Sequence, residues 1–423
     1  AERQRAFSMA FGTVLLGGGA LAALAFLAAP ALAPLTRLDD GSFRLMLAIV
    51  FSDALLAVPY AHLRMTNRSM RYAVLRLLFV GISIGLNLVL IGRLHWGVQA
   101  IFIANVVANV ALLLLFLREI GHLFRPGLLR HAPWRALWAY ALPIMPATLA
   151  VMLVENGDRI VLNYLPQAVA KAVYGMTAKD VVGIYGFNYK LGVAMLLVVQ
   201  MFRMAWTPFS LQHAREARAP QLFSRVLTAL VLACAAMFLA VALFLPSLVR
   251  IPAVEHYVKH AYWSGLAIVP VILLGYVFSG IYAVVTAGLY IERRTGVLPW
   301  IAGAGALLNI AICIVAGWHW GMVGVAWATP ASYALMAALG AWQSNRVYPV
   351  PFEWLRLLHI GLIGAALYTA DRWLAGRGVL PLSGVGLSAK LALLAGLPLL
   401  LVVTGFFRHG EWAALRALAR VRR

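Results

Sequence analysis

Long, uninterrupted apolar segments follow one another along almost the whole chain. A helix that crosses a hydrocarbon core of about 30 Å needs about 20 predominantly apolar residues, and by that measure the sequence predicts about twelve membrane-spanning helices. They cover residues 6–29, 42–63, 73–92, 96–117, 136–165, 181–209, 226–249, 263–291, 297–317, 322–342, 354–375 and 380–407. The segments are continuously apolar rather than alternating, which excludes a membrane β-barrel. We therefore predict an all-α integral membrane protein.

The composition excludes the main alternatives to a membrane protein. Of the 423 residues, 63% are hydrophobic and 12% are charged, whereas soluble domains average about 45–50% and about 25%. A soluble enzyme would have too little polar surface to cover such a core, and a disordered chain would be far less apolar.

The chain is nevertheless strongly basic, with a net charge of +21 from 35 Lys and Arg against 14 Asp and Glu. When residues 1–5 are placed in the cytoplasm and the spans alternate, 21 of the 35 cations fall on the cytoplasmic side and nine on the outer side. This is the positive-inside pattern, and it predicts a multi-pass membrane protein with a cytoplasmic C-terminus and no nucleic-acid partner. The other five cations lie within predicted spans: Arg76, Arg159, Lys190, Arg203 and Lys390.

Short fragments recur in the same order at nearly constant spacing. Residues 47–50 recur at 266–269, residues 86–87 at 308–309 and residues 95–97 at 319–321, with offsets of 219, 222 and 224. The pattern predicts two pseudo-symmetric helical lobes related by a parallel duplication, as in many transporters. Because two spans precede the second copy and none precedes the first, we expect a parent of about fourteen helices, truncated here by its first two.

We accordingly divide the chain into three parts. Residues 1–135 form the remaining four helices of the N-terminal lobe, and residues 136–350 form a C-terminal lobe of six helices. Residues 351–423 form a C-terminal helix pair with a basic cytoplasmic tail.

Four motifs at the start of the second lobe carry a family resemblance. They are Tyr-Ala-Leu-Pro-Ile-Met-Pro-Ala at 140–147, Glu-Asn-Gly-Asp-Arg at 155–159, Val-Gly-Ile-Tyr-Gly-Phe-Asn-Tyr-Lys at 182–190, and Trp-Thr-Pro-Phe at 206–209. This ordered set resembles the polysaccharide-biosynthesis, O-antigen-type flippases of the multidrug/oligosaccharidyl-lipid/polysaccharide (MOP) exporter superfamily. The resemblance implies a fourteen-helix transporter that moves lipid-linked oligosaccharides across the bacterial inner membrane by alternating access between two lobes, often coupled to a cation gradient. It also suggests a polysaccharide polymerase as a possible partner.

Cations within the membrane are the first candidates for a site, because intramembrane charge is costly and usually functional. Arg159 and Lys190 suit the pyrophosphate of a lipid carrier, and Tyr185 and Tyr189 beside Lys190 suit sugar rings. Arg203 lies nearer the cytoplasmic boundary and suits a gate. For Lys190, a pairing with a carboxylate of the preceding helix is the structural alternative.

Three carboxylates are candidates for ion coupling or for charge pairing. Asp53 lies near the middle of the second span and either titrates or hydrogen-bonds a neighbouring helix. Glu155 and Arg159 are spaced i,i+4 and can pair, while Asp158 points to another face of the helix.

Two other functions remain as alternatives. A multidrug antiporter of the same superfamily would favour acidic cavities, and a membrane glycan polymerase or ligase would need catalytic groups in long outer loops. We predict that the protein is not an enzyme. We also expect no cofactor and no metal site, because the two cysteines, Cys234 and Cys313, both lie in apolar segments.

Overall fold

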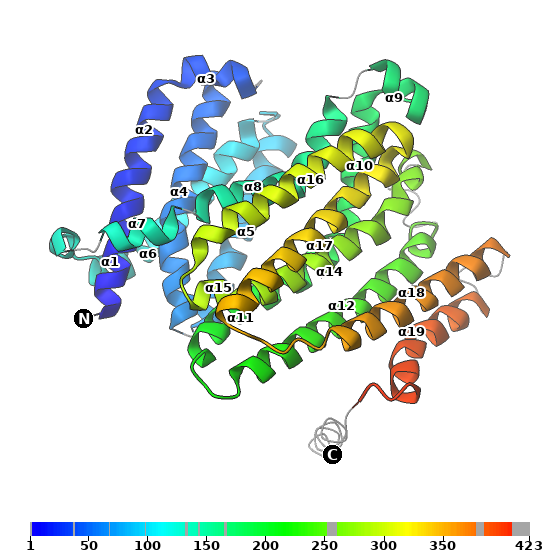
Figure 1. Ribbon diagram of the computed structural model, residues 1–423. Coiled ribbons are helices and arrows are strands. Elements are labelled where there is room, and N and C mark those ends of the chain that lie inside the picture. Colours follow the sequence, from blue (N-terminus) through cyan, green and yellow to red (C-terminus); the bar gives the residue numbers. More distant parts are fainter. Residues whose placement is uncertain are drawn as a thin grey trace. The chain divides into compact units, whose positions relative to one another are not determined.

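The computed structural model describes residues 2–36, 39–66, 68–97, 99–131, 134–142, 144–164, 167–251, 260–377 and 385–407. Within these ranges the secondary structure is entirely helical (Figure 1). Ten of the described helical segments are long and apolar enough to cross a membrane. The predicted all-α membrane fold is confirmed. The chain divides into two compact units, residues 1–135 and 136–423.

Unit 1 is a set of long helices. They are α1 (Glu2–Thr13) and α2 (Gly19–Leu27), which a π-helical turn joins, α3 (Ala29–Thr36), α4 (Asp40–Met65), α5 (Ser69–Gly92) and α6 (Gln99–Leu123). The start of α4 is capped by Asp39, whose carboxylate accepts a hydrogen bond from the Ser42 amide at 2.9 Å. Helices α4, α5 and α6 pack together around Leu112 and Phe116, which are fully buried.

Unit 2 contains the remaining helices. They are α7 (Trp134–Ala141), which begins just before the boundary, α8 (Ile144–Asn163), α9 (Gln167–Tyr174), α10 (Ala178–Leu191), α11 (Val193–His213), α12 (Ala219–Leu248), α14 (Val269–Val285), α15 (Ala287–Ile291), α16 (Leu298–His319), α17 (Gly321–Val347), α18 (Trp354–Gly376) and α19 (Val385–Val403).

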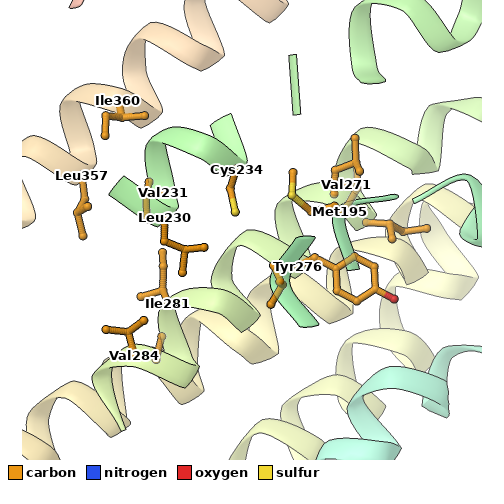
Figure 2. Close-up of a cluster of buried hydrophobic side chains, with 14 of the residues drawn as sticks. Met195, Leu230, Val231, Cys234, Val271, Tyr276, Ile281, Val284, Leu357 and Ile360 are labelled. Atoms are coloured by element: carbon orange, nitrogen blue, oxygen red, sulfur yellow. The ribbon is translucent and has the colours of Figure 1, made fainter. Parts of the chain in front are cut away.

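The core of unit 2 lies where α12 meets α14 and α18. Figure 2 shows part of this core, which includes Leu230, Val231, Cys234, Val271, Tyr276, Leu357 and Ile360. On the other side of α14 lies α17, which packs in turn against α16 and α8. Burial of these apolar faces fixes the rotation of each helix, and this rotation decides which polar side chains meet.

Two predicted spans are helical but carry more charge than the other ten. Helix α8 contains Glu155, Asp158 and Arg159, and α18 contains Asp371 and Arg372 near its end. Both helices pack inside unit 2, α8 against α16, α10 and α17, and α18 against α12 and α19.

One predicted membrane span is wrong because it is not a single continuous helix. The sequence predicted a single helix over 181–209, but the chain breaks at Gly192 between α10 and α11. A Cβ at Gly192 would lie 2.8 Å from Ile272 Cγ2 and 3.3 Å from the carbonyl oxygen of Tyr189. Glycine therefore allows this turn to approach α14 closely, and Lys190 lies in the last turn of α10 rather than in mid-helix.

The recurring His-Trp-Gly fragment occupies equivalent turns in the two units. His95–Trp96–Gly97 lies between α5 and α6, whereas His319 is the last residue of α16, Trp320 joins the two helices and Gly321 is the first residue of α17. Gly97 has φ +64° and Gly321 has φ +61°, a conformation that glycine adopts at little cost. The third residue of the fragment therefore has the same backbone conformation in both copies.

Candidate functional site

The charged residues of α8 sit in a helix that starts at a defined break. Helix α7 ends at Ala141 and α8 begins at Ile144, so the predicted span over 136–165 consists of two helices; Pro143 lies outside the described residues. Pro146 occupies the first turn of α8, where a missing amide hydrogen costs nothing. The break separates the direction of α8 from that of α7. Residues 155–159 of α8 then lie against α10 and α17.

Asp158 is the most deeply buried charge of the helix, with no exposed surface. Its Oδ2 accepts a hydrogen bond from the hydroxyl of Tyr185 on α10 at 2.7 Å, and Tyr185 is also fully buried. The other oxygen, Oδ1, accepts from the backbone amide of Arg159 at 2.7 Å. These contacts satisfy a group that would otherwise be costly at this depth.

Asp158 can reach this position because its neighbour is glycine. Gly157 faces α16, where a Cβ would lie 3.0 Å from Asn309 Oδ1. Asn309 donates from Nδ2 to the carbonyl of Val154 at 3.4 Å, and Cys313 Sγ lies 3.8 Å from Asn309 Oδ1. The interface of α8 and α16 is thus polar and tightly packed.

Glu155 is half-buried and does not pair with Arg159. Its Oε1 accepts from the hydroxyl of Tyr333 on α17 at 2.9 Å. Its backbone carbonyl accepts a long hydrogen bond, 3.4 Å, from the Tyr189 hydroxyl, which in turn accepts from Tyr276 on α14 at 3.2 Å. Tyrosines of three helices therefore surround the carboxylates of α8.

Arg159 is half-buried, and its guanidinium stands over the ring of Tyr189, 4.1 Å from the ring centre. Its Nη1 donates to Asn156 Oδ1 at 3.4 Å, while Nε is buried without a hydrogen-bond partner. No carboxylate lies within ion-pair distance of Arg159 in the described part of the chain. This is a cation held by an aromatic ring and left with free hydrogen-bonding capacity.

The other two predicted cations differ in their surroundings. Lys190 follows Tyr189 directly and is exposed, with neither a hydrogen bond nor an ion pair to any residue that the structure describes. Arg203 on α11 is anchored to α14, where its Nη2 donates to the Ser279 carbonyl at 2.8 Å and to Ser279 Oγ at 2.6 Å. Arg203 is therefore held by Ser279 and not by Arg159 or Tyr189.

Asp53 belongs to unit 1. Its Oδ1 accepts from Asn109 Nδ2 on α6 at 2.8 Å, and the same nitrogen donates to Ser52 Oγ at 2.9 Å. The hydrogen bond to a neighbouring helix, one of the two interpretations of Asp53, is therefore present.

The structure brings together Arg159, Tyr189, Tyr185, Asp158 and Glu155 at one place, and we call this group the α8–α10 cluster. Three residues near the cluster were not predicted from the sequence. Tyr276 contacts Tyr189, Tyr333 contacts Glu155, and Ser279 binds Arg203. Each lies in an apolar span, where a lone Tyr or Ser looks like ordinary helix packing. Only the rotation of α14 and α17 reveals their partners.

Comparison with known proteins identifies the fold. No protein-family model matches the chain, and no curated protein matches it in sequence. Three similar solved structures illustrate the likeness. The MATE transporter VcmN of Vibrio cholerae in the bent form is 13% identical, with a TM-score of 0.60, covering 82% of this chain and 80% of that one.

The second is a MOP superfamily transporter of Pyrococcus furiosus, described by the reverse polarity of its binding pocket. It is 17% identical with a TM-score of 0.62, covering 81% of this chain and 79% of that one. The third is the lipid II flippase MurJ in an inward closed conformation, 15% identical with a TM-score of 0.60, covering 93% of this chain and 83% of that one. The chain therefore has the fold shared by MATE transporters and MurJ, and these neighbours are transporters and flippases rather than enzymes.

Proposed function

We propose that the protein is a transporter that flips a polyprenyl-pyrophosphate-linked oligosaccharide across the bacterial inner membrane by alternating access, with its C-terminus in the cytoplasm. The observation that carries the proposal is Arg159, a half-buried guanidinium on a membrane helix without a carboxylate partner among the described residues. The fold and the four sequence motifs support the same reading.

An arginine in this state is suited to an anionic ligand. A buried cation without a counter-ion is costly, so binding an anion there recovers part of that cost. The planar guanidinium presents several N–H donors that match phosphate oxygens. The Tyr189 ring fixes the orientation of the guanidinium and leaves its edge available.

Lys190 and the tyrosines extend this chemistry. Lys190 is a second cation, exposed, and it directly follows Tyr189 in the chain. A pyrophosphate carries two phosphate groups, and two cations suit such a ligand better than a single charge. The apolar faces of tyrosine rings suit the faces of sugars.

The carboxylates are proposed to couple transport to an ion gradient. Asp158 and Glu155 each hydrogen-bond a tyrosine hydroxyl that belongs to another helix. Protonation of either carboxylate would weaken an interhelical hydrogen bond and so change the packing of α8. Asp53 with Asn109 is the corresponding candidate in unit 1.

A multidrug antiporter is the second candidate, because MATE transporters share the fold. A cationic drug would need an available carboxylate. Both carboxylates of the α8–α10 cluster already accept hydrogen bonds from tyrosines, whereas Arg159 and Lys190 have no anionic partner among the described residues. The charge of the cluster therefore favours an anionic substrate.

The test is a binding comparison with the purified full chain. We expect it to bind a short-chain polyprenyl-pyrophosphate disaccharide in preference to the cationic dye ethidium. Arg159→Gln should weaken binding of the pyrophosphate compound by about 10–100-fold, since hydrogen bonds to charged groups contribute about 1.5–3 kcal/mol.

The matched control is Arg346→Gln. Arg346 also stacks on an aromatic ring, 3.8 Å from the centre of Trp342, but lies at the end of α17 away from the cluster. The Arg346→Gln variant should bind the pyrophosphate compound as tightly as the unaltered protein does. Equal affinity of Arg159→Gln and the unaltered protein, or binding of ethidium alone, would refute the proposal.

A further inference from the structure

An apolar groove lies where α14, α12 and α18 of unit 2 meet. Its volume is about 420 Å³, within the range of about 300–1,000 Å³ typical of ligand pockets. Val231 and Phe238 of α12, Val271 of α14 and Ile360 of α18 line it. Figure 1 shows these three helices running alongside one another, as their packing requires.

A second, smaller cavity of about 190 Å³ adjoins the groove. The two share Ala267, Pro270 and Tyr368 in their linings, so they adjoin one another at these residues. Unlike the groove, the smaller cavity is lined by two arginines, Arg250 just beyond α12 and Arg372 near the end of α18.

The two arginines leave a positive charge at this end of the groove. Arg372 Nη2 pairs with the buried Asp371 at 2.6 Å, and the Arg372 side chain is 43% exposed. The guanidinium carbon of Arg250 lies 5.8 Å from the centre of the Trp263 ring, and no carboxylate among the described residues is within ion-pair distance of Arg250. The lining of the smaller cavity therefore contains two guanidinium groups, and the one carboxylate paired with them, Asp371, is buried beside Arg372.

The dimensions of the groove match one leaflet of a bilayer. Arg372 and Ile360 lie twelve residues apart on α18, and a rise of 1.5 Å per residue makes that about 18 Å. Half of a hydrocarbon core is about 15 Å. A chain that starts at the arginines and runs along the groove would therefore end near the middle of the membrane.

We propose that this groove binds a bilayer phospholipid, with its phosphate on Arg250 and Arg372 and one acyl chain between α12, α14 and α18. Tyr368 lies at the junction and Trp263 lines the smaller cavity, and side chains of this kind usually border lipid headgroups. The lipid is a ligand in its own right, and the inference does not depend on which substrate the protein transports.

Two glycines make the groove testable. A Cβ at Gly361 or at Gly364 would have no atom within 4 Å, so a side chain there has room to enter the groove. Gly303 on α16 has the same open surroundings and lies outside the groove. It provides a matched control for the same substitution.

The experiment counts lipids retained by the full chain. The protein is reconstituted in nanodiscs of phosphatidylglycerol, released in the gas phase and analysed by native mass spectrometry. Arg250→Gln should retain the most tightly held lipid about fivefold less, because one cation near a phosphate contributes about 1 kcal/mol. Gly364→Leu should also lose this lipid.

Two controls separate the site from general effects. Arg377→Gln removes an arginine at the same end of α18 that stacks on Trp373 at 3.7 Å, and it should leave retention unchanged. Arg250→Lys and Gly303→Leu should likewise retain the lipid, and added inorganic phosphate should not displace it.

Equal retention by Arg250→Gln and Arg377→Gln would overturn the proposal. So would loss of the lipid in Arg250→Gln with full retention in Gly364→Leu, because the site would then hold only a phosphate group. If Gly364→Leu fails to fold, the comparison of Arg250→Gln with Arg250→Lys still decides the matter.

Discussion

Replacing Tyr185 by phenylalanine removes one hydroxyl from the buried Asp158 carboxylate and leaves the ring in place. Hydrogen bonds between helices in membranes contribute about 0.6 kcal/mol on average and up to about 1.7 kcal/mol. The Tyr185–Asp158 hydrogen bond is short, 2.7 Å, fully buried, and made to a carboxylate. Its free-energy contribution should therefore lie near the upper end of this range. We therefore expect Tyr185→Phe to lower the free energy of unfolding by about 1.5 kcal/mol.

The assay is reversible unfolding in mixed micelles as the fraction of SDS is raised. In an Asp158→Asn background the partner is neutral, so the same tyrosine substitution should cost only about 0.6 kcal/mol. The difference between the two costs, a double-mutant cycle, isolates the interaction with the carboxylate.

Tyr60 supplies the matched control. Its ring is buried in unit 1, and its hydroxyl is buried without a hydrogen-bond partner among the described residues. Tyr60→Phe should therefore leave stability within about 0.5 kcal/mol or raise it. If Tyr185→Phe has no effect, or costs the same in both backgrounds, Asp158 is not held as described.

Three further predictions follow from local geometry. Gly324→Ala should lower the thermal midpoint, because its Cβ would lie 2.6 Å from the backbone oxygen of Ala316, whereas Gly303→Ala, with no atom within 4 Å, should leave it unchanged or raise it. Tyr189→Phe should keep most of the affinity for the anionic substrate, but Tyr189→Leu should lose about 5–30-fold, because a partly desolvated cation–π contact contributes about 1–2 kcal/mol. Burial raises the pKa of Tyr348, just beyond α17, above its usual value of 10. The contribution of the neutral tyrosine to stability is therefore present below pH 10 and is lost as the pH rises through the higher pKa of the folded state. Tyr348→Phe should make this alkaline loss of stability shallower, as measured by unfolding at pH 9 and pH 11.

The membrane helices were largely predictable because apolar length alone decides whether a segment crosses a bilayer. The break at Gly192 was not, because it depends on how closely the chain approaches Ile272, 80 residues further on. The charges in α8 and α18 mark the two predicted spans that fall outside the ten most apolar ones.

The candidate site was only partly predictable. The residues of α8 and α10 stood out as charges and tyrosines in apolar segments. Their partners did not, because the i,i+4 spacing of Glu155 and Arg159 suggested a local ion pair. In the folded chain, Glu155 instead meets Tyr333, 178 residues away, and Arg159 meets the ring of Tyr189. Such pairings depend on the rotation of packed helices, which local spacing does not encode.

The most direct test of the proposed function is to delete the gene from the organism that carries it and determine on which leaflet lipid-linked oligosaccharide accumulates. A flippase predicts accumulation on the cytoplasmic leaflet, reversed by a copy of the intact gene and by the Arg346→Gln copy, but not by Arg159→Gln at equal expression. Accumulation on the outer leaflet, or full reversal by Arg159→Gln, would contradict the account.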